Sequence, residues 1–306
     1  MRVFNGFTEA TGIRNPVVTT GSFDGVHIGH KTILNRLKSL AGKIDGESVL
    51  ITFHPHPRKV LYPETAGKDL KLINTQEEKL HLLEKAGLDN IIVVEFTRDF
   101  ARTRSEEFVR DYLTGILGAR IIVVGFNHHF GFNQEGDYRQ LWEMRAKYNF
   151  EAEEIPEQEV QHETVSSTRI RKAISEGYIQ RANAYLDHYY IVIGEPLNHE
   201  KVSDITGLNF SIVPLVEDTK LIPPPGVYAT SFEKGSVKGK AILLINKDFS
   251  NEPAVYLSCN EMAIEDGEKI KIEFQKRITG NINLNDKHSS RSRINAAAAE
   301  ISELIF

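Results

Sequence analysis

Four short and nearly continuous apolar runs punctuate the first half of the chain, and they constrain its fold more than any other feature. They occupy residues 17–20, 48–53, 91–94 and 121–124, with helical patterns between them. Strands that are apolar along their whole length are typical of a parallel sheet covered by helices on both faces. We therefore expect an α/β domain with a doubly wound parallel sheet, whose ligands bind beyond the carboxyl ends of the strands.

The segments around these strands follow the same plan. Helices are predicted over residues 76–86 and 105–117, the second capped by Ser105 and carrying carboxylates in its first turn. Polar loops follow the strands, and six of the eleven histidines lie in them: His27, His30, His54, His56, His128 and His129. Because these loops should share one edge of the sheet, a binding site there is the favoured interpretation over plain surface connections.

The loop after the first strand, residues 21–30, reads GSFDGVHIGH. Its glycines would let the backbone approach a phosphate, and the helix that follows would favour negative charge at its start. His27 and His30 are three residues apart and would share one helical face. The loop lacks both the Lys-Ser or Lys-Thr of a P-loop and the G-x-G-x-x-G of dinucleotide folds. Taken alone, it is equally consistent with a tight turn bearing two surface histidines.

A second candidate is the stretch VSSTRIRK at residues 165–172. Its hydroxyl residues suit the N-cap of a helix. Three hydroxyls and three cations beside a helix start could also grip a triphosphate, because arginine can bind phosphate in a bidentate manner. Alone, the stretch is better described as an ordinary capped helix, so its functional meaning depends on the histidine turn.

Metal ligation is the competing chemistry for the histidines. A catalytic zinc site needs three protein ligands, yet the chain has no H-E-x-x-H and no third ligand can be named from spacing. We therefore predict no protein metal ligand. A Mg²⁺ ion that arrives with a nucleotide is a separate matter, since it uses phosphates and water as ligands.

Residues 21–30 closely resemble the signature of the nucleotidylyltransferase superfamily. Over residues 14–190 the chain resembles one branch of it, the prokaryotic FAD synthetases, which are usually bifunctional riboflavin kinase/FMN adenylyltransferases. Four segments in order carry this similarity: GSFDGVHIGH, ITFHPHPRKVL, VVGFNHHFGFNQEGDY and VSSTRIRKAISEGYIQRANAYL. The resemblance implies an enzyme that transfers AMP from ATP to FMN, with Mg²⁺ as cofactor.

The resemblance also implies roles for individual residues. The catalytic residues would be His27, His30 and Arg171. The ATP-binding residues would be Gly21, Ser22, Phe23, Asp24, Gly29, Ser167, Thr168 and Arg169. The residues lining the FMN and adenine sites would be Phe53, His54, Pro55, Gly125 and Asn127. Ser22 stands where Asn is frequent in the family, a mild departure that keeps hydrogen-bonding capacity.

The second half shows a different sequence pattern, with short β-rich runs from about residue 189 and a helical pattern over residues 293–304. Such runs separated by turn residues indicate an antiparallel barrel or sandwich. The resemblance implies a small riboflavin-kinase-like β-barrel here. We predict a nucleotidylyltransferase domain over residues 1–187 and the barrel domain over residues 188–306.

The kinase motifs depart from the family pattern. Where the family carries G-F-P-T-A-N, residues 207–212 read GLNFSI, and Val255 or Tyr256 stands where a carboxylate base is expected. A phosphotransferase without its Mg²⁺ ligands and base should lose several orders of magnitude in rate. We therefore predict that the kinase domain is degenerate. Displaced ligands stay open, the candidates being Glu217, Asp218 and Asn246.

Three functions follow. The first is an FAD synthetase that uses FMN made elsewhere, the second a bifunctional enzyme that also phosphorylates riboflavin, and the third a non-catalytic flavin or nucleotide sensor. Two intact phosphate-binding motifs favour an enzyme over a sensor.

Composition agrees with small-molecule substrates. A net charge of −5 without a long Lys/Arg run argues against nucleic acid as a partner. The single cysteine, Cys259, excludes an intrachain disulfide and fits a reducing compartment. No apolar run approaches the ~20 residues of a membrane span, and the N-terminus has no apolar signal core, so we expect a cytoplasmic protein.

Overall fold

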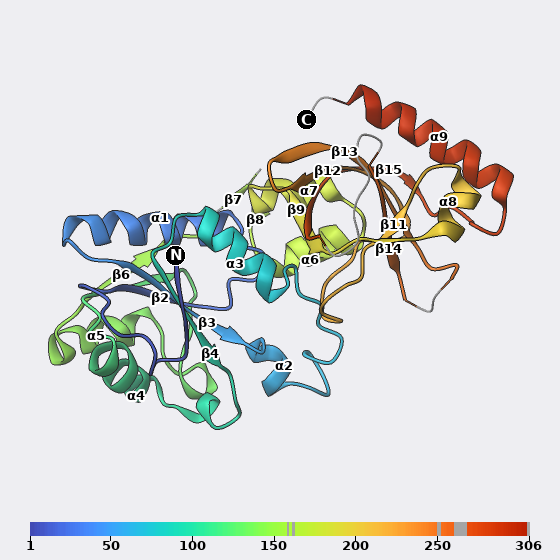
Figure 1. The fold of residues 1–306 in the computed structure, drawn as a ribbon. Coiled ribbons are helices and arrows are strands. Elements are labelled where there is room, and N and C mark those ends of the chain that lie inside the picture. The colour runs from blue at the N-terminus through green and yellow to red at the C-terminus, as the bar shows by residue number, and fades with distance from the viewer. Residues whose placement is uncertain (158, 161–162, 250–251, 260–267, 305–306) are drawn as a thin grey trace. The chain divides into compact units, whose positions relative to one another are not determined.

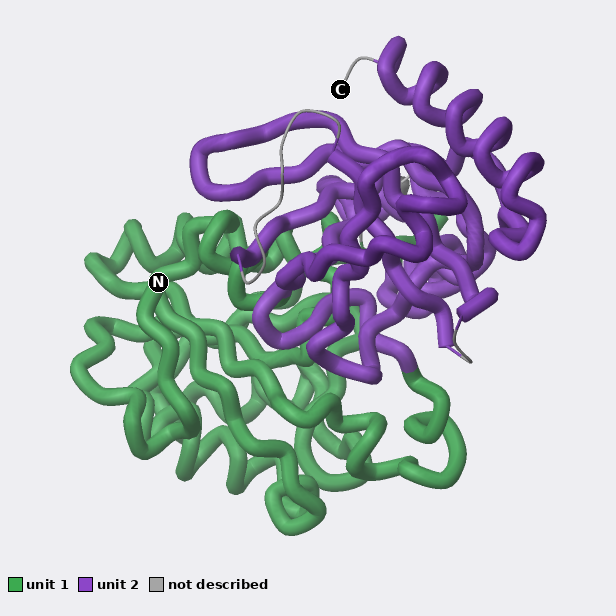
Figure 2. Tube along the Cα trace, turned by 45° about the vertical axis from the view of Figure 1, so that its right-hand side comes forward, with its two compact units in different colours: residues 1–70, 79–165 green, residues 71–78, 166–306 purple. Residues whose placement is uncertain are grey.

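The computed structural model describes residues 1–157, 159–160, 163–249, 252–259 and 268–304. The chain forms two compact units (Figure 2): unit 1 contains residues 1–70 and 79–165, and unit 2 contains residues 71–78 and 166–306. A short segment from the first half of the sequence therefore belongs to unit 2. The predicted domain boundary at residue 187 falls inside unit 2 and stays a prediction about domains.

Unit 1 is built on a six-stranded sheet in the order β1-β4-β3-β2-β5-β6, and every neighbouring pair is parallel. The strands are β1 (Arg2–Asn5), β2 (Val17–Thr20), β3 (Ser48–His54), β4 (Asn90–Glu95), β5 (Ile121–Gly125) and β6 (Glu151–Ile155). The four predicted strands are confirmed as the four inner ones. The two edge strands, β1 and β6, were not predicted from the sequence.

Helices cover both faces of this sheet (Figure 1), which confirms the doubly wound fold. On one face, apolar side chains of η2 (Phe108–Ile116) and α5 (Tyr138–Tyr148) form a buried cluster with those of the inner strands. On the other lie α1 (Ile28–Lys43) and α3 (Gln76–Lys85). The remaining short elements are α2 (Pro57–Leu61), η1 (Phe100–Arg102), α4 (Ser105–Glu107), η3 (Phe132–Gln134), β7 (Glu159–Val160) and β8 (Glu163–Thr164).

The helix predicted over residues 105–117 is not a single α-helix. After one α-helical turn in α4 the backbone continues as a π-helix, η2. Ser105 is also not the cap, because the N-cap is Arg104 and makes no side-chain cap bond. Instead, the backbone N–H and hydroxyl of Ser105 donate to Glu135 Oε1 at 2.9 and 3.3 Å. A contact with a distant loop therefore replaces the local cap that the sequence pattern indicated.

Unit 2 is built on a seven-stranded antiparallel sheet in the order β10-β11-β14-β13-β12-β15-β9. It forms a half-barrel, as predicted from the β-rich runs. The strands are β9 (Tyr190–Gly194), β10 (Leu197–Asn198), β11 (Ser211–Ile212), β12 (Gly226–Lys234), β13 (Val237–Asn246), β14 (Ala254–Ser258) and β15 (Ile270–Gly280).

Four helices accompany this sheet: α6 (Ser167–Ser175), α7 (Ile179–Leu186), α8 (Glu200–Thr206) and α9 (Lys287–Glu303). The terminal helix starts earlier than predicted, because the Asp286 side chain caps it by accepting from the N–H of Ser289 at 3.1 Å. In α7, Asn183 donates to the Phe274 carbonyl and accepts from the Tyr190 N–H, both at 2.8 Å. The α7 helix is thereby tied to two strands of the half-barrel.

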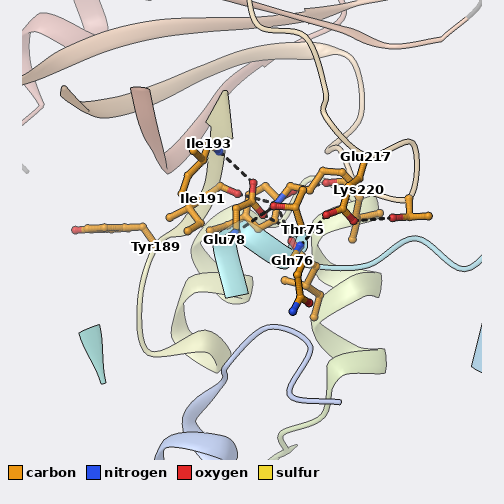
Figure 3. A network of polar contacts seen from close by, with 12 residues as sticks. Thr75, Gln76, Glu78, Tyr189, Ile191, Ile193, Glu217 and Lys220 are labelled. Carbon is orange, nitrogen blue, oxygen red and sulfur yellow. Dashed lines mark hydrogen bonds and ion pairs between the residues drawn. The ribbon is translucent and has the colours of Figure 1, made fainter. Parts of the chain in front are cut away.

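A buried ion pair joins residues 71–78 to the rest of unit 2 (Figure 3). Lys220 Nζ lies 2.5 Å from Glu78 Oε2, and the two side chains are 1% and 0% exposed. Lys220 also donates to the carbonyls of Ile73 at 2.7 Å and Ile191 at 2.8 Å, while Glu78 Oε1 accepts from the Ile193 N–H at 3.1 Å. Both charges thus have several partners, the condition under which a buried ion pair is tolerated.

Within the described ranges, no helix combines the length and the apolar character needed to cross a bilayer.

Candidate active site

The predicted histidine turn lies between β2 and α1, and its two imidazole rings are stacked on each other. The ring centroids of His27 and His30 are 3.6 Å apart, and the ring of Phe23 stacks on the other side of His30 at 4.3 Å. His27 is also the N-cap of α1, since its Nδ1 accepts from the His30 N–H at 3.4 Å. The sequence spacing therefore produces a compact stack at a helix N-terminus.

The turn occupies the point of the sheet where the strand order reverses. Strand β2 is flanked by β3 on one side and β5 on the other, and α1 begins directly after the turn. Ligands of open α/β sheets bind in the crevice at such a switch point. The free N–H groups and the dipole of α1 favour an anion there.

His30 is held as a neutral imidazole. Its pKa lies well below the ordinary value of 6.5, first because burial disfavours the charged form and then because His27 and Lys79 repel a positive charge. Its Nδ1 is buried and has no hydrogen-bond partner in the part of the chain that the structure describes. A buried polar atom of this kind costs free energy unless a ligand or solvent satisfies it, so it is suited to meeting a substrate.

Two glycines of the turn leave little room for a side chain. A Cβ on Gly29 would lie 3.3 Å from the His27 ring, and one on Gly21 would lie 3.0 Å from the Phe23 ring. A methyl group at either position would press on the ring stack. Both glycines thus contribute to the position of the imidazoles.

The stack faces a cavity of about 1010 Å³, near the upper end of the ~300–1,000 Å³ range of ligand pockets. The turn forms one part of its lining, and Phe53, Phe96 and Phe100 form another, with ring centroids 5.4 to 6.1 Å apart. A cavity lined by both polar groups and aromatic rings suits a ligand that joins phosphates to a planar ring.

The predicted site residues divide into three groups. Nine line the cavity: Gly21, Ser22, Phe23, His27, Gly29, His30, Phe53, Gly125 and Asn127. Within the described ranges, the lining leaves out Asp24, His54 and Pro55. The remaining four lie on α6 in unit 2 and stay predictions: Ser167, Thr168, Arg169 and Arg171. The expected cap of α6 is confirmed, because the Ser166 hydroxyl accepts from the Arg169 N–H at 3.4 Å.

Three further histidines of the predicted binding edge line the cavity: His56, His128 and His129. His128 lies in the loop after β5 and has a defined partner. Its Nε2 lies 3.1 Å from the hydroxyl of Thr20, the last residue of β2. Burial, with a smaller effect of His129, lowers the pKa of His128 to about 4. His128 is thus neutral at neutral pH and joins the loops that follow the two strands at the switch point.

This lowered pKa makes stability depend on pH. The unfolded chain takes up a proton at His128 below the ordinary pKa of 6.5, whereas the folded chain does so only near 4. The contribution of His128 is therefore complete above pH 6.5 and is lost as the pH falls toward 4, on the order of 3 kcal/mol in all. Urea unfolding from pH 7.5 to 4.5 should give a shallower pH dependence for His128→Asn than for the wild type.

The matched control for this titration is His288→Asn, because His288 is an exposed residue on α9. Carboxylates protonate in the same pH range, but they do so equally in all three proteins. An unchanged pH dependence in His128→Asn would contradict the assigned environment of His128.

The comparisons with known proteins agree with this geometry. Residues 10–169, more than half of the chain, match the family model described as FAD synthetase. This chain belongs to the FAD synthetase family. A bifunctional riboflavin kinase/FMN adenylyltransferase of Listeria monocytogenes is 33% identical over 246 residues, covering 79% of this chain and 76% of that protein. An FAD synthetase of the same organism is 35% identical over 218 residues, covering 71% and 81%.

Other comparisons extend over more of the chain. The bifunctional riboflavin kinase/FMN adenylyltransferase of Bacillus subtilis is 29% identical over 272 residues, which is 86% of this chain and 84% of that protein. A solved structure described as a macrolide-efflux protein from Streptococcus pneumoniae superimposes with a TM-score of 0.87, at 23% identity and 99% coverage of both chains. At 23% identity this similarity shows a shared fold and nothing about function.

Membership of the FAD synthetase family raises the question of Mg²⁺. Among the described residues there is no group of three or more His, Cys, Asp or Glu side chains that could hold a metal ion. The site therefore does not fit a metal held mainly by the protein.

Proposed function

We propose that the histidine turn performs the adenylyl transfer of an FAD synthetase, an FMN adenylyltransferase that makes FAD and pyrophosphate from FMN and ATP. The observation that carries this proposal is the His27–His30 stack, with centroids 3.6 Å apart at the N-terminus of α1, lining a cavity that aromatic rings also line. A sensor would need the cavity but not a stacked imidazole pair aimed at phosphates.

The reaction needs no strong general acid or base. An oxygen of the FMN phosphate attacks the α-phosphorus of ATP, a new P–O bond forms, and the bond to the β-phosphate breaks to release pyrophosphate. Because a phosphate is already an ionised nucleophile, positioning and charge stabilisation are sufficient. His27 and His30 lie at the N-terminus of α1, where phosphates are favoured. The neutral imidazole of His30 supplies an N–H donor without the cost of a buried charge.

The remaining groups have supporting roles in this proposal. Ser167, Thr168, Arg169 and Arg171 bind the triphosphate, with Arg171 offsetting charge that develops on the leaving pyrophosphate. Mg²⁺ supplies further charge neutralisation when it arrives with ATP. Phe53, Gly125 and Asn127 belong to the cavity lining and receive the flavin and adenine rings.

We further propose that the chain starts from FMN and does not phosphorylate riboflavin. In residues 207–212, Phe210 is 1% exposed and packs in the core of unit 2, and its N–H donates to Ser203 Oγ at 2.8 Å. Two of the candidate displaced ligands have structural partners. Glu217 Oε1 accepts from the Gln76 N–H at 2.8 Å, and Asn246 donates to the Ile282 carbonyl at 2.7 Å. These contacts support the proposal that the half-barrel has kept its fold but not the riboflavin kinase activity.

A chromatographic assay tests both parts. Purified protein freed of bound flavin is incubated with ATP and Mg²⁺, and with either FMN or riboflavin. We expect FAD and pyrophosphate from FMN and no phosphorylated product from riboflavin. FMN or FAD formed from riboflavin would overturn the monofunctional assignment. No product from either flavin would overturn adenylyl transfer and favour a flavin or nucleotide sensor.

A further inference from the structure

We propose that Lys79, on α3, is a positioning residue for adenylyl transfer: it fixes the carbonyl of Ser22 and, through it, the histidine stack. This inference rests on the proposed function and extends it to a residue outside the sequence motifs. Lys79 is 7% exposed although lysine is almost never buried without a specific partner. The carbonyl that it contacts belongs to Ser22 in the turn, and the hydroxyl belongs to Thr52 on β3.

The contacts form a small closed triangle in unit 1. Lys79 Nζ lies 3.4 Å from the Ser22 carbonyl oxygen and 3.2 Å from the Thr52 hydroxyl. That hydroxyl, which is fully buried on β3, lies 3.2 Å from the same Ser22 oxygen. Ser22 therefore accepts from two donors on two different elements. Two such bonds fix the plane of the peptide that joins Ser22 to Phe23.

That peptide matters because the next residue is strained. Phe23 has φ of 50°, a left-handed conformation that a bulky side chain adopts only when its surroundings enforce it. Its ring is 3% exposed and stacks on His30 at 4.3 Å, with an angle of 22° between the ring planes. A rotation of the peptide before Phe23 would move this ring, and with it the support of His30.

Lys79 also contributes through its charge. It is one of the causes that keep the pKa of His30 below its ordinary value, after burial and His27. Lys79 thus both fixes the Ser22 carbonyl and helps to keep His30 neutral.

Three variants test this role: Lys79→Met, Thr52→Val and the double variant. The Met side chain keeps the length of lysine without its charge, and valine matches threonine in shape without a hydroxyl. We expect kcat/KM for ATP to fall about 10- to 100-fold in Lys79→Met and about 3- to 10-fold in Thr52→Val, since small displacements of a catalytic group are costly. The double variant should resemble Lys79→Met alone, because both changes act on the Ser22 carbonyl. The FMN KM should stay within twofold.

The matched control is Lys38→Met, which removes a lysine whose Nζ donates to the Ala86 carbonyl at 2.6 Å, away from the turn. This control should keep the wild-type kcat/KM. If Lys79→Met does not fold, the inference is tested by Thr52→Val alone. An unchanged kcat/KM for ATP in Thr52→Val would then overturn it. So would a rise in the FMN KM as large as the rise in the ATP KM in Lys79→Met. A wild-type protein that makes no FAD would contradict the proposed function instead, and the ATP dissociation constants of these variants would then test Lys79.

Discussion

His30→Ala is expected to lower kcat for FAD formation by at least about 100-fold while the protein stays folded. Removal of one donor aimed at developing charge typically costs 10²–10³ in rate. His30 also stands at the centre of the ring stack, between Phe23 and His27. Its loss would leave His27 without its neighbour as well, so we expect an effect at the upper end of this range. The measurement is steady-state FAD formation at saturating ATP and FMN.

The control for this prediction is His288→Ala, which removes an exposed imidazole on α9. FMN binding, followed by quenching of flavin fluorescence, should change little in either variant, because the role proposed for the turn is to bind the ATP phosphates. A His30→Ala protein that retains more than a tenth of wild-type kcat would contradict the catalytic role of His30.

Lys220→Met is expected to destabilise the protein by about 3–5 kcal/mol, the largest effect on stability that we predict. The change leaves the Glu78 carboxylate fully buried without its cation, and a buried charge without a partner costs several kcal/mol. The Ile73 and Ile191 carbonyls would lose a donor at the same time. Urea unfolding followed by circular dichroism measures the effect.

Two further variants separate burial from charge. Lys269→Met breaks an ion pair with Glu77, the neighbour of Glu78, whose side chains are 56% and 44% exposed, so its cost should stay below about 1 kcal/mol. The double variant Lys220→Met with Glu78→Leu removes both buried charges and should recover a large part of the lost stability. If Lys220→Met costs no more than Lys269→Met, the buried pair does not support unit 2.

Much of the fold was predictable because its signals are local. The four inner strands of unit 1 are continuous apolar runs, and a strand buried on both faces must look like this. The edge strand β6, EAEEI, was missed because only Ala152 and Ile155 are buried and three glutamates stand between or before them. The π-helix η2 was missed because helical periodicity cannot tell which carbonyl each N–H will reach.

In the site, too, local features were predictable from the sequence, whereas contacts between distant residues were not. The spacing of His27 and His30 predicted that they share one face of a helix, but it did not predict that His27 caps α1 or that the two rings stack. Lys79 is 57 residues from Ser22, and His128 is 108 residues from Thr20. In the sequence Lys79 looks like one of many helix-surface lysines. His128 was predicted to belong to the binding edge, but nothing in the sequence indicates its contact with Thr20. Their roles arise only when β3, β5 and α3 assemble around β2.

Unit 2 is made of two separate segments of the chain, so it cannot finish folding until both have been synthesised on the ribosome. Glu78 leaves the ribosome 142 residues before Lys220, the cation that neutralises it. At about 5–20 residues per second, that carboxylate waits for roughly 7–28 s before its partner has been synthesised. Unit 2 therefore cannot finish folding as an independent second half. A truncated chain of residues 166–306 alone would lack residues 71–78 and leave Lys220 with an unpaired charge.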